Sequence, residues 1–114
     1  MTMERHKPAA GADQAEFPVI APEGDLDVEN LEPLASRLRS AAADSPVVII
    51  DATRITFGDS SLLRVLLEVQ RLTEVRIAGP QPAVRRLIEL VGFDRVLKVF
   101  PSLEAAEAAP VPVR

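Results

Sequence analysis

The sequence predicts a single α/β domain in which about four helices pack on a mostly parallel, mixed sheet of about four strands. Two features of the chain predict this class. Short apolar runs alternate with longer segments whose apolar residues recur at three- and four-residue steps, which gives a β-α-β-α order with short connections. The run 47–50 (VVII) has four consecutive β-branched residues, a pattern typical of a strand buried on both faces between helices. A chain of 114 residues suits one small domain of this kind.

The composition narrows the classes of function. Hydrophobic residues make up 47% of the chain and aromatic residues 4%, so the core is expected to be aliphatic, and base stacking has little to build on. The net charge of −4 and the scattered Lys and Arg residues argue against a nucleic-acid partner. No apolar run approaches the ~20 residues that cross a bilayer, so no membrane partner is expected. The lack of cysteine excludes disulfides and thiolate chemistry and fits a cytoplasmic protein.

The chain ends on both sides in segments without apolar periodicity. Residues 1–15 are polar and are predicted to be a disordered leader, although residues 2–7 could instead add an edge strand. The domain is predicted to occupy residues 16–109, with a tail at 110–114. The single histidine, His6, lies in the leader, and a His-based metal site or a Ser-His-Asp triad would have to use it. We therefore expect neither a metal nor a cofactor.

The first half of the domain begins with an apolar run. Two prolines within 17–22 (FPVIAP) favour an edge strand or an irregular one. Residues 23–27 (EGDLD) then turn the chain, and Asp27 is a plausible N-cap for a helix over about 28–43. The apolar residues that predict this helix are Leu31, Leu34, Ala35, Leu38, Ala41 and Ala42.

The second half continues the alternation. The buried strand at 47–50 is followed by a connection over 52–57 and by a helix at 62–72, whose apolar residues cover a broad face. The remaining predicted elements are a strand at 75–78, a helix at 82–91, an apolar stretch at 96–100 and a short helix at 103–109 with Ser102 as its N-cap.

Residues 59–61 (DSS) stand where the 62–72 helix should begin. A helix start leaves backbone N–H groups without partners inside the helix, so this site is exposed by construction. In open α/β sheets, functional sites gather outside the carboxyl ends of the strands, and this segment lies just beyond such an end. Asp and Ser at a helix start are common caps, but here there are three candidates where one suffices. Two interpretations therefore stay open, a structural cap and a regulated phosphoacceptor serine.

Several segments, in this order, resemble a known family. The segment 23–27 precedes a helix, the strand 47–51 (VVIID) follows, and 56–61 (TFGDSS) leads into the next helix. The later segment 82–87 (PAVRRL) is similar as well. Together, over residues 17–109, they resemble the STAS domain of bacterial anti-sigma factor antagonists.

The resemblance implies a phosphorylation switch. In that family, the unphosphorylated form binds an anti-sigma factor that is also a serine kinase, and so frees a sigma factor. The kinase phosphorylates the serine directly after the aspartate, which ends the binding, and a serine phosphatase resets the switch. By this resemblance the phosphoacceptor is Ser60. The partner-binding residues that it implies are Asp25, Asp27, Asp59, Ser61 and Leu62.

Two residues depart from the family's usual pattern. Members commonly have glycine after the two hydroxyl residues, where this chain has Leu62, and a bulkier apolar residue before the aspartate, where it has Gly58. Leu62 favours the helix by up to ~1 kcal/mol over glycine. Leu62, like Leu63 and Leu66, is expected to belong mostly to the core, with part of its side chain exposed beside Ser60, where it would suit an interface.

Two other classes of function compete with this one. A STAS module can also serve a lipid-transport complex or a stress-sensing assembly, and Ser60 would then be a contact or a relic. No glycine-rich phosphate loop and no paired catalytic constellation is present, so we do not expect an enzyme. The expected protein is a monomer or a weak dimer.

Overall fold

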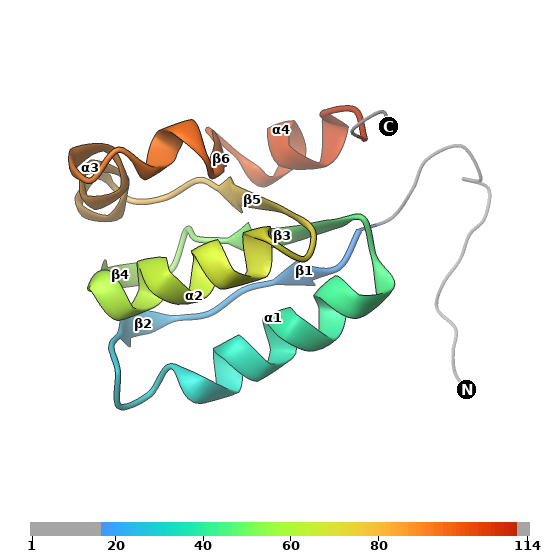
Figure 1. The fold of residues 1–114 in the computed structure, drawn as a ribbon. Helices are drawn as coiled ribbons and strands as arrows, with labels where there is room; N and C mark the ends of the chain where they lie inside the picture. Colours follow the sequence, from blue (N-terminus) through green and yellow to red (C-terminus); the bar gives the residue numbers. More distant parts are fainter. Residues whose placement is uncertain (1–16, 112–114) are drawn as a thin grey trace.

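A four-stranded parallel sheet forms the centre of the protein, of which the computed structural model describes residues 17–111 (Figure 1). The strand order is β1-β3-β5-β6, and every neighbouring pair is parallel, which confirms the predicted fold class. The strands are β1 (Val19–Ile20), β3 (Val47–Asp51), β5 (Glu74–Ala78) and β6 (Lys98–Phe100). The helices are α1 (Glu32–Asp44), α2 (Ser60–Gln70), α3 (Pro82–Leu90) and α4 (Leu103–Ala108), with a 3-10 turn η2 (Phe93–Arg95) before β6. The predicted leader at 1–15 lies outside the described residues.

The central strand β3 is buried on both faces, as its four β-branched residues predict. Val48 and Ile50 belong to the main core, which α1, α2 and α3 cover. Val47 and Ile49 point to the other face, where they form a smaller cluster with Ala106 of α4. The sheet is therefore covered by helices on both faces, thickly on one and thinly on the other.

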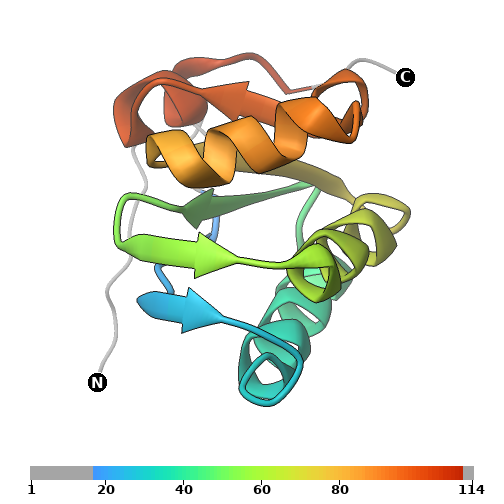
Figure 2. The same cartoon turned by 90° about the vertical axis from the view of Figure 1, so that its left-hand side faces the viewer.

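Two further strands form a separate parallel pair, which the sequence analysis missed. These are β2 (Gly24–Leu26), where a turn was predicted, and β4 (Ile55–Gly58), where a connection was predicted. The prediction was wrong because these short strands contain no run of buried apolar residues: Asp25, Thr56 and Phe57 are exposed, and only Leu26 and Ile55 are large buried apolar residues. Figure 2 shows β2, β4 and α3 side by side at one end of the molecule. That end lies beyond the carboxyl ends of β1 and β3, which precede β2 and β4 in the chain.

Helix α1 begins later than predicted, at Glu32 rather than near residue 28. Asp27 does not cap it, because the Asp27 side chain accepts a hydrogen bond from the backbone N–H of Glu29 at 3.0 Å and so closes a local turn instead. The backbone N–H of Asp27 also donates to the side-chain oxygen of Asn30 at 2.9 Å. Pro33 then lies in the first helical turn, where a proline needs no hydrogen-bond acceptor.

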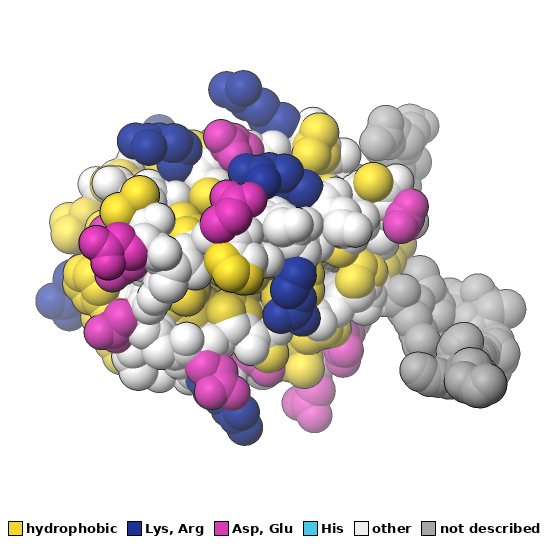
Figure 3. Space-filling view, turned by 90° about the horizontal axis from the view of Figure 1, so that it is seen from below, with side chains coloured by type: hydrophobic (Ala, Val, Ile, Leu, Met, Phe, Trp, Pro, Cys, Tyr) yellow, Lys and Arg dark blue, Asp and Glu magenta, His cyan; other side chains and the backbone are white. Residues whose placement is uncertain are grey.

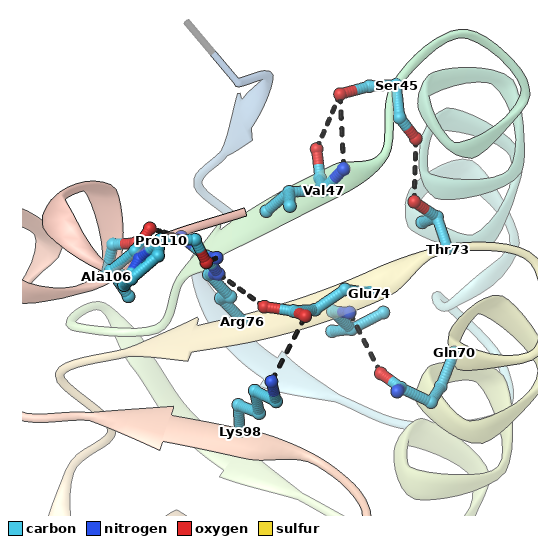
Figure 4. A network of polar contacts seen from close by, with 11 residues as sticks. Ser45, Val47, Gln70, Thr73, Glu74, Arg76, Lys98, Ala106 and Pro110 are labelled. Atoms are coloured by element: carbon cyan, nitrogen blue, oxygen red, sulfur yellow. Dashed lines mark hydrogen bonds and ion pairs between the residues drawn. The ribbon is translucent and has the colours of Figure 1, made fainter. Parts of the chain in front are cut away.

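A buried arginine ties α4 to the sheet (Figure 4). Arg76 of β5 is fully buried, and its guanidinium donates to Glu74 at 2.6 Å, which in turn binds Lys98 at 3.2 Å. The same group donates to three backbone carbonyls at the end of α4: Ala106, Ala109 and Pro110. These carbonyls have no partner within the helix, so Arg76 caps the carboxyl end of α4 from the sheet.

Candidate functional site

The candidate site is the junction at which β4 ends and α2 begins. Gly58 is the last residue of β4, Asp59 is the N-cap, and Ser60 is the first residue of α2. The Asp59 backbone is extended, and its Oδ1 accepts a hydrogen bond from the backbone N–H of Ser61 at 2.9 Å. Of the three candidate caps in the sequence, Asp59 therefore performs the capping.

Neither serine side chain caps the helix. Ser60 is exposed and Ser61 is half-buried. Neither hydroxyl has a hydrogen-bond partner within residues 17–111. Because the carboxylate of Asp59 already satisfies the helix start, the hydroxyl of Ser60 is free to react or to contact another molecule.

Leu62 lies in the core, so the prediction that it is partly exposed beside Ser60 is wrong. Its side chain is 2% exposed, and its Cδ2 lies 2.5 Å from the place where a Cβ on Gly58 would be. A side chain in that position cannot contact a docked partner, and we remove Leu62 from the partner-binding residues. The two departures from the family pattern are thus one exchange, in which the Leu62 side chain fills the space that a larger residue at position 58 would take.

The structure brings the predicted acidic residues beside this junction. In the β2–β4 pair, Asp25 lies opposite Phe57, and Leu26 lies opposite Gly58, the residue before Asp59. Asp25 is exposed, and its carboxylate accepts a hydrogen bond from the hydroxyl of Thr56. The segments around 25 and 59, distant in the sequence, therefore form one surface.

Phe57 is a surface residue that the sequence analysis passed over. It is 53% exposed, although it lies in a paired strand two residues before Asp59. Val28, in the turn after β2, is 73% exposed. The available signal was composition, since Phe57 is one of only four phenylalanines in a chain without Trp or Tyr.

Away from the β4–α2 junction, the surface has no single sign of charge. On the face seen from below in Figure 3, acidic and basic side chains are interspersed with hydrophobic ones. A groove of about 440 Å³ between α3 and β6 is lined by Arg85, Ile88, Glu89 and residues 94–100. None of residues 58–62 at the β4–α2 junction lines it. Within residues 17–111, no helix is long and apolar enough to cross a membrane, and no cluster of three or more His, Cys, Asp or Glu side chains could hold a metal ion.

Comparison with known proteins gives a family and several structural neighbours. A sequence model of the STAS domain matches residues 9–106. None of the curated proteins matches the chain. An anti-sigma factor antagonist from Mycobacterium paratuberculosis is similar in structure, with a TM-score of 0.70 and 28% identity over 77% of this chain and 80% of that one.

Three other solved structures are less similar in sequence and support the fold alone. The anti-sigma factor antagonist SpoIIAA in its unphosphorylated form has a TM-score of 0.61 and 23% identity over 71% of this chain and 76% of its own. Bacillus SpoIIAA in the phosphorylated form has a TM-score of 0.56 and 22% identity over 71% and 79%. The STAS domain of a SulP transporter from Vibrio cholerae has a TM-score of 0.65 and 18% identity over 94% and 82%.

Proposed function

This chain belongs to the STAS domain family, and from that premise we propose that it is an anti-sigma factor antagonist controlled by phosphorylation. In the proposed cycle, the unphosphorylated protein binds an anti-sigma factor that is a serine kinase, and a sigma factor is released. The kinase then phosphorylates Ser60 and binding ends. A serine phosphatase removes the phosphate and restores the binding form.

One observation carries the assignment of Ser60. Its hydroxyl is exposed at the first position of α2, and Asp59 already caps that helix. If a serine hydroxyl capped the helix, its phosphorylation would remove the cap and destabilise the helix. Because Asp59 caps α2, phosphorylation of Ser60 leaves the cap in place. The structural neighbour SpoIIAA has both an unphosphorylated and a phosphorylated form, and its fold is the one that this chain shares.

The fold tolerates the modification for electrostatic reasons. A phosphoserine carries about −1.5 to −2 charges at pH 7, and the amino end of α2 is the positive end of the helix dipole. Arg64 is exposed one turn further along α2, at the i+4 position from Ser60, on the same side of the helix. Asp59 acts in the opposite direction because it places a like charge next to the phosphate.

The phosphate on Ser60 is expected to weaken binding of the kinase. A kinase that phosphorylates Ser60 must bring the terminal phosphate of ATP to the Ser60 hydroxyl, so a phosphate already on Ser60 faces like charges in the complex. Like-charge juxtaposition in an interface costs several kcal/mol, and about 2.8 kcal/mol is enough to weaken binding a hundredfold. Binding can therefore end without a change in the fold of the domain.

The test uses the full chain and its cognate kinase from the same host. We expect the wild type and Ser60→Ala to bind the kinase, Ser60→Asp to bind about a hundredfold more weakly, and mass spectrometry to locate the phosphate on Ser60. Ser61→Ala is the matched control, because it removes the neighbouring hydroxyl and leaves the acceptor. Equal binding by wild type and Ser60→Asp, or phosphate on Ser61 alone, contradicts the proposal.

A second candidate function has one observation in its favour. The STAS domain of the Vibrio SulP transporter aligns over 94% of this chain. In this alternative, the chain is a module of a lipid-transport complex or a stress-sensing assembly, and Ser60 is a contact or a relic. Absence of phosphate on Ser60 after incubation with the cognate kinase, together with capture of transporter subunits by the immobilised chain, favours the alternative.

A further inference from the structure

We propose that Phe57 is the anchor of the partner interface, and that the surface docking on it is basic and presents an arginine to the Phe57 ring and to Asp25. This inference rests on the proposed function, because it specifies the chemistry of the partner at the same end of the molecule. Three features of the protein support it: the irregular pairing of β2 with β4, the exposure of Phe57 and the charge around it.

The β2–β4 pair contains an irregularity that turns Phe57 outward. Gly24 pairs with Ile55, but the next residue, Asp25, pairs with Phe57, so Thr56 is an extra residue on β4. In a regular strand Ile55 and Phe57 would point to the same face. Here Ile55 is 2% exposed and Phe57 is 53% exposed. Bulges of this kind re-aim a side chain and are frequent next to functional sites.

The exposed position of Phe57 has no structural benefit within residues 17–111. Its ring is left largely in water, although burial of a phenylalanine side chain stabilises a fold. Its backbone is fixed in a strand that is paired with β2 and packed beside α3. An exposed aromatic side chain on such a strand, next to the candidate phosphoacceptor, has the properties of an interface anchor.

The charge around Phe57 defines the partner. Residues 23–30 contain four carboxylates and residues 54–60 contain one, whereas Arg54 is the one basic residue in these two segments. Arg54 is already paired with Glu23 at 3.0 Å, at the far end of β2. Asp25, directly opposite Phe57, is exposed and belongs to no ion pair among the described residues. Helix α3, packed beside β4, adds the exposed Arg85, Arg86 and Glu89, so the three segments together still carry more carboxylates than arginines. The net charge beside Phe57 is therefore negative, and complementarity calls for a basic partner.

Arginine fits this arrangement better than lysine. A planar guanidinium can stack on an aromatic ring while its N–H groups donate to a carboxylate. Phe57 and Asp25 present such a ring and carboxylate side by side on adjacent strands.

The main test measures binding of the cognate kinase to Phe57→Ala and to Leu72→Ala, which removes a side chain that is 63% exposed on a different part of the molecule. We expect at least a tenfold loss for Phe57→Ala, less than a twofold change for Leu72→Ala, and a weaker salt dependence for Asp25→Asn than for the wild type. Kinase binding by Phe57→Ala at wild-type strength overturns the inference. If Ser60→Asp also binds normally while Phe57→Ala does not, the surface is correct and the proposed switch is not.

A second test needs no kinase. We would titrate the isotope-labelled chain with a capped peptide that contains two arginines around a leucine, and use as control the same peptide with glutamine in place of arginine. The arginine peptide is expected to shift the amide signals of residues 25 and 57 selectively, and Phe57→Ala to abolish these shifts. Equal shifts from both peptides, or shifts spread over the whole surface, contradict the inference.

Discussion

The amino ends of α2 and α4 both carry a serine, and the two serines do different things. At α4, Ser102 is the N-cap, and its hydroxyl accepts a hydrogen bond from the backbone N–H of Ala105 at 3.1 Å. At α2 the carboxylate of Asp59 takes that role, and the hydroxyl of Ser60 has no partner within residues 17–111. The comparison teaches that a serine at a helix start is a candidate for modification when another residue supplies the cap.

The largest expected effect concerns the opposite end of α4, where Arg76 caps the helix. Arg76→Ala removes the guanidinium that caps the carboxyl end of α4 and leaves Glu74 with Lys98 alone. We expect the free energy of unfolding to fall by about 3–5 kcal/mol, as is usual when one partner of a buried ion pair is removed. Urea denaturation measures the loss, and amide hydrogen exchange should locate it in α4. A loss below about 1 kcal/mol would show that the α4 carbonyls find other partners.

The next largest effect concerns the platform beneath Ser60. Leu62→Ala should destabilise the fold by about 2–4 kcal/mol through the cavity it leaves, and Gly58→Ala by about 1–3 kcal/mol because its Cβ meets the Leu62 side chain. In the double variant, the Cβ at position 58 no longer meets the leucine tip. We therefore expect the loss to be smaller than the sum of the single losses, as measured by denaturation. Additive losses would mean that the two positions do not share the space.

A smaller effect tests the two serines directly. Ser102→Ala should cost about 1 kcal/mol because α4 loses its cap, whereas Ser60→Ala should change the free energy of unfolding by less than about 0.5 kcal/mol. Asp59→Ala serves as the matched variant at α2 and should resemble Ser102→Ala. The same denaturation experiment compares all three. A large loss for Ser60→Ala would place that serine among the structural caps.

The smallest expected effect tests whether Arg64 stabilises α2 once Ser60 is phosphorylated. If Arg64 pairs with phosphorylated Ser60 across one helical turn, Arg64→Ala should lower the stability of the phosphorylated protein by about 0.3–0.5 kcal/mol. The unphosphorylated protein provides the control, and its stability should not change. Thermal melting at low salt measures both forms. Equal changes in the two forms would mean that Arg64 acts through packing and not through the phosphate.

Local patterns in the sequence were sufficient to predict the sheet and the helices. Four β-branched residues at 47–50 predicted a doubly buried strand, and Ser102 was correctly predicted as a cap. Both inferences depend on residues that are close in the sequence. The position of residues 59–61 at the start of α2 was also predicted in this way.

The features that were missed depend on contacts between distant segments. The β2–β4 pair joins residues about 30 positions apart, and its bulge decides that Phe57 faces outward. Arg76 reads in the sequence as an ordinary polar residue in a strand, and its carbonyl partners lie 30 to 34 positions further on. The apolar face of the helix predicts that Leu62 is mostly core, but its complete burial depends on the space that Gly58 leaves for it.

The position of Arg76 has a practical consequence for engineering the chain. Its guanidinium carbon lies 5.3 Å from the centre of the Phe17 ring, and it also holds the carbonyl of Pro110, so the first and last described segments converge on one group. Figure 1 shows this convergence at the opposite end of the protein from the β4–α2 junction. A short linker can therefore join residues 17 and 110, and a circular permutant can place its new termini elsewhere without crossing the Ser60 surface. Fluorescent labels attached near residue 17 or residue 110 should likewise leave docking undisturbed.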